Sequence, residues 1–255
     1  MRHGPARLGL LLFAMFCAAC GAERTSAPPS VTAVQGVPQA STLPPESTAA
    51  PSRAAILPPS TETLPPAPRA FTENFDSASP YWTFLQVDNG PAAPGPATQA
   101  GSLSFDLAAA NQWTAEIYES QDYTDVRVEA RLDFGAGGQG AAGVICRYGR
   151  TSGWYEFNIY PDQSYMLLFG QWLAEGVARY TPLVRSESEK IQPGANDIGL
   201  WCEGNTLTPY VNGTQLRKRQ ENTLILNSGK IGISAASFED LPVAISYDWV
   251  QVSEP

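Results

Sequence analysis

Apolar and polar residues alternate one by one along most of the chain from Phe71 onward. In the segment 126–134, charged residues separate the apolar residues Val126, Val128, Ala130, Leu132 and Phe134. A period of two is typical of a strand that buries one face and exposes the other. The pattern therefore predicts a half-buried strand here, with a charged outer face.

Similar runs follow as far as the end of the chain. They cover Val144–Tyr148, Trp154–Tyr160, Tyr165–Phe169, Val177–Leu183, Asp197–Glu203, Leu207–Val211, Lys230–Ala235 and Val243–Val252. Turn-forming residues separate them, and the pair Asn212-Gly213 favours a two-residue type I′ hairpin turn. No stretch shows sustained helical spacing, and many short strands with frequent turns are typical of two packed sheets. We predict an all-β fold, a two-sheet antiparallel sandwich over residues 71–255.

The run WYEFNIY, residues 154–160, has two contrasting sides. The side that suits a core consists of Tyr155, Phe157 and Ile159. The other side consists of Trp154, Glu156, Asn158 and Tyr160. Sugar rings stack on flat aromatic rings and form hydrogen bonds with amide and carboxylate groups, so the second side is a candidate sugar-binding surface.

The lengths of the hairpin loops determine which neighbours join that surface. If Gly149–Ser152 is a four-residue loop, Arg147 lies beside Trp154, and a similar loop at Pro161–Ser164 places Tyr165 beside Tyr160. The expected ligand-binding face then consists of Arg147, Trp154, Glu156, Asn158, Tyr160 and Tyr165. The alternative is an exposed cross-strand ion pair of Arg147 with Glu156, with aromatic residues covering a pleated surface.

Residues 1–19 are expected to be a secretory signal peptide. A short basic segment precedes the apolar run Leu8–Phe16, which is too short to span a bilayer, and small residues follow it. Ala18-Ala19-Cys20 resembles the lipobox of bacterial lipoproteins, although Cys17 stands where Leu is usual, so Cys20 is the expected lipidation site. Each buried methylene of an acyl chain contributes about 0.8 kcal/mol. The anchor would hold the protein on a membrane of the cell envelope, facing outside the cytoplasm.

Residues 20–70 are expected to be a tether. From Gly21 to Ala70 the chain holds half of its 22 prolines and no Trp, Tyr or Phe. Such a segment cannot bury enough apolar surface to offset the entropy lost on ordering. We expect a disordered Pro-, Ser- and Thr-rich spacer, partly in polyproline II form, between the membrane and the folded domain.

Charge and missing residue types exclude several functions. Acidic residues outnumber basic ones by 25 to 16, and a surface of that sign repels phosphate backbones, so we expect no nucleic-acid partner. The single histidine, His3, belongs to the signal segment. The mature chain would therefore lack an imidazole for a nucleophile–histidine system, a histidine zinc site or general acid–base catalysis. We expect no organic cofactor.

Two cysteines lie in the expected domain. Cys146 and Cys202 both occupy the apolar side of their strands. In an exported protein this placement favours a disulfide, which the chain-entropy treatment values at about 4 kcal/mol. Two unpaired buried thiols are the alternative.

Five motifs resemble the concanavalin A-like lectin and glucanase superfamily, particularly extracellular modules of bacterial lipoproteins. They are Phe71–Asp76, Gly143–Tyr148, Trp154–Ile159, Leu200–Gly213 and Asp248–Val252. The resemblance implies a jelly-roll sandwich, and the group includes laminin G-like modules, endo-glucanases and a domain named for 3-keto-disaccharide hydrolysis. Some members hold a structural calcium near the joined chain ends, which makes Asp76 and Asp248 candidate ligands. Carboxylates that cap strand ends are the alternative.

The resemblance leaves catalysis open. The glucanases carry the strand motif E-x-D-x-E, whereas here Glu156 is followed by Asn158 and Tyr160. A glycosidase needs two carboxylates, about 5–5.5 Å apart for retention or 6.5–9.5 Å for inversion. Our first hypothesis is a non-catalytic carbohydrate-recognition or adhesion module. The alternatives are a 3-keto-disaccharide hydrolase-type enzyme with Glu156 as general acid or base, and a structural envelope domain that binds another protein. Neither the glycan nor the oligomeric state follows from the sequence.

Overall fold

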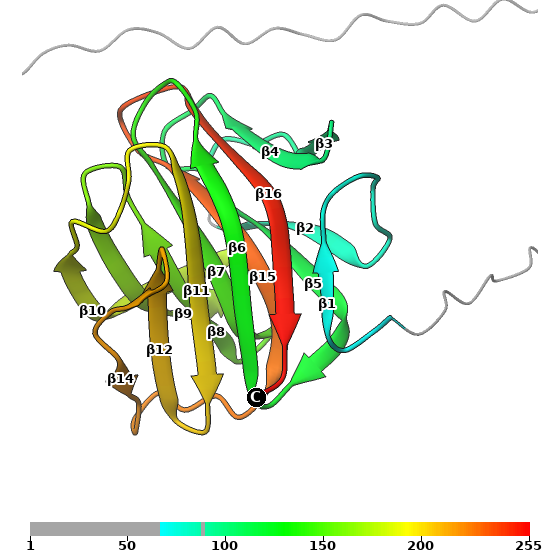
Figure 1. Ribbon diagram of the computed structural model, residues 1–255, viewed down its shortest axis with the longest axis vertical. Coiled ribbons are helices and arrows are strands. Elements are labelled where there is room, and N and C mark those ends of the chain that lie inside the picture. The colour runs from blue at the N-terminus through cyan, green and yellow to red at the C-terminus, as the bar shows by residue number, and fades with distance from the viewer. Residues whose placement is uncertain (1–66, 88–89) are drawn as a thin grey trace, which may run out of the picture. The chain divides into compact units, whose positions relative to one another are not determined.

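A computed structural model describes residues 67–87 and 90–255 of the chain. In this part every regular element is a strand, no helix forms, and so no helix is long and apolar enough to cross a membrane. All strand pairs are antiparallel and build two sheets that pack face to face (Figure 1). The predicted all-β, two-sheet sandwich is confirmed. The signal segment, Cys20 and most of the tether lie outside the described residues and stay predictions.

The first sheet has nine strands. They are β1 (Phe71–Glu73), β3 (Ala97–Gln99), β4 (Ser102–Leu107), β6 (Val126–Phe134), β11 (Ala195–Glu203), β12 (Thr206–Val211), β13 (Thr214–Gln215), β14 (Arg219–Gln220) and β16 (Val243–Ser253). The order is β13-β12-β11-β6-β16-β4-β3, with β1 paired to β16 and β14 to β12. Asn212 and Gly213 both have positive φ, 47° and 74°, which fits the predicted type I′ turn between β12 and β13.

The second sheet has seven strands and carries the candidate site. They are β2 (Trp82–Val87), β5 (Trp113–Tyr123), β7 (Gly140–Gly149), β8 (Gly153–Ile159), β9 (Ser164–Ala174), β10 (Val177–Glu187) and β15 (Gly229–Ser237). Their order is β10-β9-β8-β7-β15-β5-β2. The sequence pattern did not single out β1 to β5. In β5, Trp113, Ala115 and Ile117 alternate with Thr114 and Glu116, yet residues on both faces are buried.

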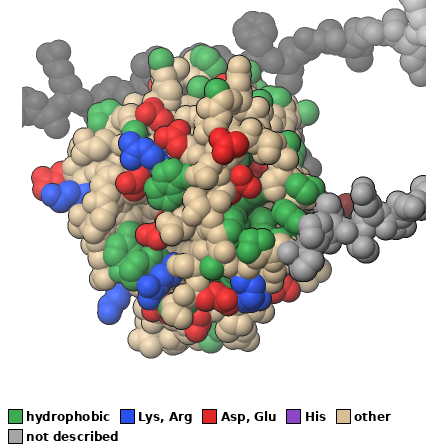
Figure 2. Space-filling view, turned by 45° about the vertical axis from the view of Figure 1, so that its right-hand side comes forward, with side chains coloured by type: hydrophobic (Ala, Val, Ile, Leu, Met, Phe, Trp, Pro, Cys, Tyr) green, Lys and Arg blue, Asp and Glu red, His purple; other side chains and the backbone are tan. Residues whose placement is uncertain are grey.

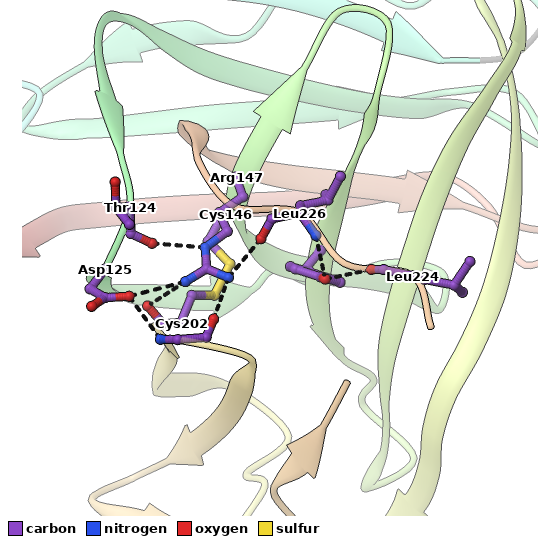
Figure 3. Close-up of a disulfide and its surroundings, with 9 residues drawn as sticks. Thr124, Asp125, Cys146, Arg147, Cys202, Leu224 and Leu226 are labelled. Atoms are coloured by element: carbon purple, nitrogen blue, oxygen red, sulfur yellow. Dashed lines mark hydrogen bonds and ion pairs between the residues drawn. A yellow bond between two sulfur atoms is a disulfide. The ribbon is translucent and has the colours of Figure 1, made fainter. Parts of the chain in front are cut away.

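The main core fills the space between the sheets. Val126, Val128, Ala130 and Leu132 of β6 are fully buried, and they belong to the same cluster as Phe157 of β8. A disulfide between Cys146 of β7 and Cys202 of β11 joins the two sheets and confirms the predicted pairing (Figure 3). The domain is therefore held together by apolar packing and by one covalent cross-link between its layers.

A second apolar cluster covers the outer face of the seven-stranded sheet. Its buried members are Val87, Ala115, Ile117, Ile145, Tyr148 and Trp154. Because both faces are covered, every residue of β8 is buried. A parallel sheet between helices commonly has such strands, but an antiparallel sheet more often leaves one face in water. The side of WYEFNIY that was the candidate sugar-binding surface lies on this covered outer face.

Charged side chains are interspersed on the surface rather than segregated. On the face that Figure 2 presents, Lys and Arg side chains lie near Asp or Glu side chains, and hydrophobic patches are separated by polar atoms. This view contains no continuous basic patch of the kind that tracks a phosphate backbone.

Candidate functional site

Seven aromatic residues line the outer face of the seven-stranded sheet, and we call them the aromatic track. They are Tyr148, Trp172, Trp154, Tyr180, Trp113, Phe238 and Tyr160. Successive rings are in contact, with centroid separations from 4.2 Å for Trp113–Tyr180 to 6.3 Å for Trp113–Phe238 and Tyr148–Trp172. Tyr148 and Trp154 are buried, while the other five are partly exposed. The track thus offers ring surface to a ligand along much of the sheet.

The outer face must be concave for these rings to meet. Trp113 belongs to β5 and Tyr180 to β10, five strand positions apart in the sheet order. On a flat sheet, strands spaced by about 4.8 Å would place them about 24 Å apart. Their centroids are nevertheless 4.2 Å apart in a stacked arrangement. The curvature of the sheet therefore brings its two sides together over β8.

Glu156 lies beneath this stack at the centre of the concave face. Its side chain accepts hydrogen bonds from Trp113 Nε1 at 3.1 Å, Trp154 Nε1 at 2.9 Å and Ser234 Oγ at 2.6 Å. Ser234 Oγ also lies 3.3 Å from Asn158 Oδ1. Trp113, Trp154 and Ser234 come from three different strands, so Glu156 ties β5, β8 and β15 together on this face.

The surroundings of Glu156 limit the chemistry that it can perform in this conformation. Burial raises the pKa of its carboxyl group above the ordinary value, and the hydrogen bonds from Ser234, Trp154 and Trp113 oppose that shift. A raised pKa is what a general acid needs. However, Glu156 is 1 % exposed, and the space around it is too small for a water molecule. No substrate atom can reach the carboxyl group without displacing the rings above it.

An open groove adjoins the buried centre, and we call it the Tyr160 groove. Its volume is about 450 Å³. Trp113, Tyr160, Tyr180 and Phe238 supply its aromatic walls. Its exposed polar residues are Gln139, Asp162 and Arg185. Flat rings with a few polar groups at the rim are the composition expected of a sugar-binding groove.

A second groove lies at the other end of the track. It has a volume of about 680 Å³ and is lined by Tyr148, Trp172, Arg150, Glu175 and other residues of the β7–β8 and β9–β10 loops. Leu173 at its margin is 60 % exposed. A long ligand that followed the aromatic track would enter both grooves.

Trp154, Glu156, Asn158 and Tyr160 do share one face, as the alternation predicts, but the expectation of an open face is wrong for the first three. Each of these three is 1 % exposed, because rings from β5 and β10 lie over β8. Asn158 Nδ2 is buried and has no hydrogen-bond partner among the described residues. Only Tyr160 reaches a groove.

Tyr165 lies on the opposite face from the one expected. It pairs with Ile159 rather than standing beside Tyr160, since the loop between β8 and β9 closes through a bond from Tyr160 N to Ser164 O. The loop therefore has three residues instead of four, with Gln163 at φ 70°. One residue of register reverses the face of every side chain that follows. Tyr165 accordingly packs in the main core, 6.1 Å from the ring of Phe157.

The predicted position of Arg147 is wrong for a similar reason. Gly149 pairs with Gly153, so the β7–β8 loop again has three residues, and a β-bulge follows Cys146. At the bulge Arg147 has a φ of 54°, and its side chain points to the carbonyl groups beside the disulfide (Figure 3). Burial lowers the pKa of Arg147, while Tyr155 and Asp125 oppose this. The alternative interpretation, an ion pair of Arg147 with Glu156, is wrong as well, because Arg147 pairs with Asp125.

Sequence reasoning missed five residues of the aromatic track, namely Tyr148, Trp172, Tyr180, Trp113 and Phe238. Tyr180 lies in a predicted strand, so the face on which its side chain lies could have been derived in the same way as that of Trp154. Trp113 lies in β5, which the pattern did not single out. Trp113 and Tyr180 meet over Glu156 because the sheet is curved. The alternation of apolar and polar residues does not reveal this curvature.

Asp248, one of the two calcium candidates, faces an arginine. Asp248 Oδ2 lies 3.4 Å from Arg131 Nε. No group of three or more His, Cys, Asp or Glu residues suited to a metal ion exists among residues 67–87 and 90–255. Asp248 lies in the middle of β16 rather than at a strand end, and a calcium site at Asp76 and Asp248 stays a prediction.

A second buried carboxyl group, that of Glu116 on β5, lies away from the aromatic track. It is 7 % exposed and lines a cavity of about 160 Å³ at the edge of the sandwich. Burial raises the pKa of Glu116 to about 7. The carboxyl group accepts no hydrogen bond and forms no ion pair with any described residue.

Glu116 makes the stability of the domain depend on pH. The folded-state pKa of about 7 lies above the ordinary value of 4.5, so the contribution of Glu116 to stability is most favourable below pH 4.5 and is lost as pH rises toward 7. Replacing Glu116 by glutamine should raise the free energy of unfolding by about 2 kcal/mol at pH 8.5, after allowance for partial solvent screening, and leave it nearly unchanged at pH 4.5. Urea denaturation at both pH values measures this. Glu119→Gln, on the same strand but in an ion pair with Arg150, should change stability far less; a similar gain from both variants would contradict the prediction.

No protein-family model matches the chain, and no curated protein matches its sequence. Solved structures do match it. The endo-β-1,3-glucanase from Pyrococcus furiosus is 12 % identical, with 74 % of this chain and 98 % of that chain covered and a TM-score of 0.54. LamAcat from Zobellia galactanivorans is 11 % identical, with 72 % and 96 % covered and a TM-score of 0.53. A glycoside hydrolase family 16 endo-glucanase from Bacteroides ovatus is 10 % identical, with 72 % and 99 % covered and a TM-score of 0.53. The domain therefore has the concanavalin A-like jelly-roll fold that these proteins share.

Proposed function

We propose that this protein is a carbohydrate-recognition or adhesion module that binds a glycan along the aromatic track without cleaving it. The carrying observation is the Tyr160 groove, in which four aromatic residues and three exposed polar residues surround about 450 Å³. Glucanases are among the proteins that share its fold, and these act on carbohydrates, which supports the ligand class. The lipid anchor at Cys20 and the location outside the cytoplasm belong to the same proposal.

The enclosure of Glu156 favours binding over hydrolysis. Two carboxyl groups must flank the scissile bond in a typical glycosidase. On β8, Glu156 is followed on the same face by Asn158, and water is excluded from its carboxyl group. Glu156 instead holds the indoles of Trp113 and Trp154 in place. Its role in the proposal is to position the aromatic track.

The hydrolase-type alternative has one specific observation in its favour, the raised pKa of Glu156. If the stack of Trp113 on Tyr180 opened, Glu156 would become a general acid at the floor of the cleft. Turnover of a 3-keto-glycoside by the unmodified chain, lost in Glu156→Gln, would support this alternative over simple binding. The envelope protein-binding alternative has no comparable observation.

Glycan binding should depend on the partly exposed rings of the Tyr160 groove. Tyr160→Ala and Phe238→Ala should each weaken binding at least about fivefold, because each removes stacking surface worth about 1 kcal/mol or more. Trp154→Ala is unsuitable, since Trp154 is buried and donates to Glu156. A glycan array with the full-length chain identifies the polysaccharide, and calorimetry measures the two variants.

Tyr210→Ala is the matched control. Tyr210 stacks on Trp201 at 4.2 Å on the nine-stranded sheet, away from the groove. Its removal should leave glycan affinity unchanged. Failure to bind any glycan on a broad array would overturn the proposed function, and loss of binding in Tyr210→Ala alone would move the site to the other sheet.

A further inference from the structure

The cavity beside Glu116 lies at the edge of the sandwich, away from the aromatic track. Its lining comes from the β1–β2 connection, β2, β3, β4 and β5, the strands on the right-hand side of Figure 1. The wall is mixed: Phe75, Trp82, Leu103 and Pro96 supply its apolar parts, and Ser79 and Thr98 add hydroxyl groups. The volume of about 160 Å³ would hold about five water molecules.

The carboxyl group of Glu116 is the unusual feature of this cavity. Glu116 is 7 % exposed as a residue and lines the cavity, yet no described residue donates a hydrogen bond to its carboxyl group or offers it a positive charge. Buried carboxylates are ordinarily paired or hydrogen-bonded, because an unpaired charge in an apolar site is costly. The site therefore lacks a cationic or hydrogen-donating partner.

The walls favour an organic cation over a metal ion. Calcium requires six to eight oxygen ligands, and this cavity offers one carboxyl group and two hydroxyl groups. Two aromatic rings line it instead, Phe75 and Trp82, with centroids 6.2 Å apart. Aromatic rings attract weakly hydrated ammonium groups through cation–π interaction.

We propose that the Glu116 cavity binds a small alkylammonium compound, with the ammonium group against the Glu116 carboxylate and the alkyl groups against Phe75 and Trp82. The ligand supplies the positive charge that the described residues do not. The raised pKa of Glu116 fits a carboxyl group whose partner is a ligand rather than a side chain. This proposal does not depend on glycan binding, which uses other residues on the outer face of the sheet.

Choline and its neutral isostere 3,3-dimethylbutan-1-ol are the probes that test it. Saturation-transfer NMR with the full-length chain at pH 8 should show binding of choline and at least tenfold weaker binding of the neutral alcohol, because only choline carries the charge. Glu116→Gln keeps the shape of the side chain and should weaken choline binding at least tenfold. Glu119→Gln, which alters a partly exposed carboxylate on the same strand, should not.

Three outcomes would overturn the proposal. They are no detectable choline binding, equal binding of choline and the alcohol, and choline affinity that survives Glu116→Gln. Displacement of choline by equimolar calcium or potassium chloride would assign the cavity to a metal ion instead and would also overturn it. Tyr160→Ala should leave choline binding intact, so failure here and failure of the glycan proposal are distinguishable.

Discussion

Replacing Arg147 by methionine is expected to lower the free energy of unfolding by about 3–5 kcal/mol. The guanidinium group donates hydrogen bonds to five acceptor oxygens at the end of the sandwich. They are the backbone oxygens of Thr124, Cys202, Gly204 and Leu226 and the carboxylate of Asp125. The side chain is only 2 % exposed, so methionine would fill a similar volume but leave these oxygens without a donor. Guanidinium chloride denaturation measures the loss.

Two other variants show whether geometry or charge carries the effect of Arg147. Arg147→Lys keeps the positive charge but replaces a planar fork of donors with a single ammonium group, so it should recover less than half of the lost stability. Arg150→Met removes an ion pair with Glu119 in which Arg150 is 71 % exposed, and it should cost less than about 1 kcal/mol. Full stability in Arg147→Lys would contradict the geometric explanation.

The strands could be predicted from the sequence because their register is imposed by one buried face. The segment 126–134 forms β6 with the expected bounds, and its apolar residues face the core. Alternation also placed Trp154, Glu156 and Asn158 on a common face. It could not show that this face is covered, because the cover comes from Trp113 and Tyr180, far away in sequence and joined only by sheet curvature.

Loop lengths caused the errors in the predicted site. A run of four turn-forming residues can form a four-residue loop. It can equally form a three-residue loop, with the fourth residue of the run paired in a strand. Gly149, the first residue of the run Gly149–Ser152, pairs with Gly153. Ser164, the last residue of the run Pro161–Ser164, accepts a hydrogen bond from Tyr160 N through its carbonyl oxygen. Each difference of one position moved a side chain, Arg147 or Tyr165, from the expected face. A difference of one residue in loop length leaves no signal in the composition of the loop.

Removing the disulfide is expected to have the other large effect. Cys146 and Cys202 are 56 positions apart and fully buried between the two sheets, so their bond closes a long loop of the unfolded chain. The chain-entropy treatment gives a loss of about 4 kcal/mol for Cys146→Ala with Cys202→Ala. Arg147 follows Cys146 directly and donates to the carbonyl of Cys202, so the cross-link and the guanidinium group hold the same end of the sandwich. Urea denaturation of the full-length chain measures the change.

The single variants make this prediction specific to the bond. Either Cys146→Ala or Cys202→Ala alone breaks the cross-link, so each should cost nearly as much as the double variant rather than half of it. Dithiothreitol should lower the denaturation midpoint of the unmodified chain toward that of the double variant, and should leave the double variant unchanged. If the two single losses simply add up to the double loss, the stabilisation comes from packing of two separate thiols and not from their bond.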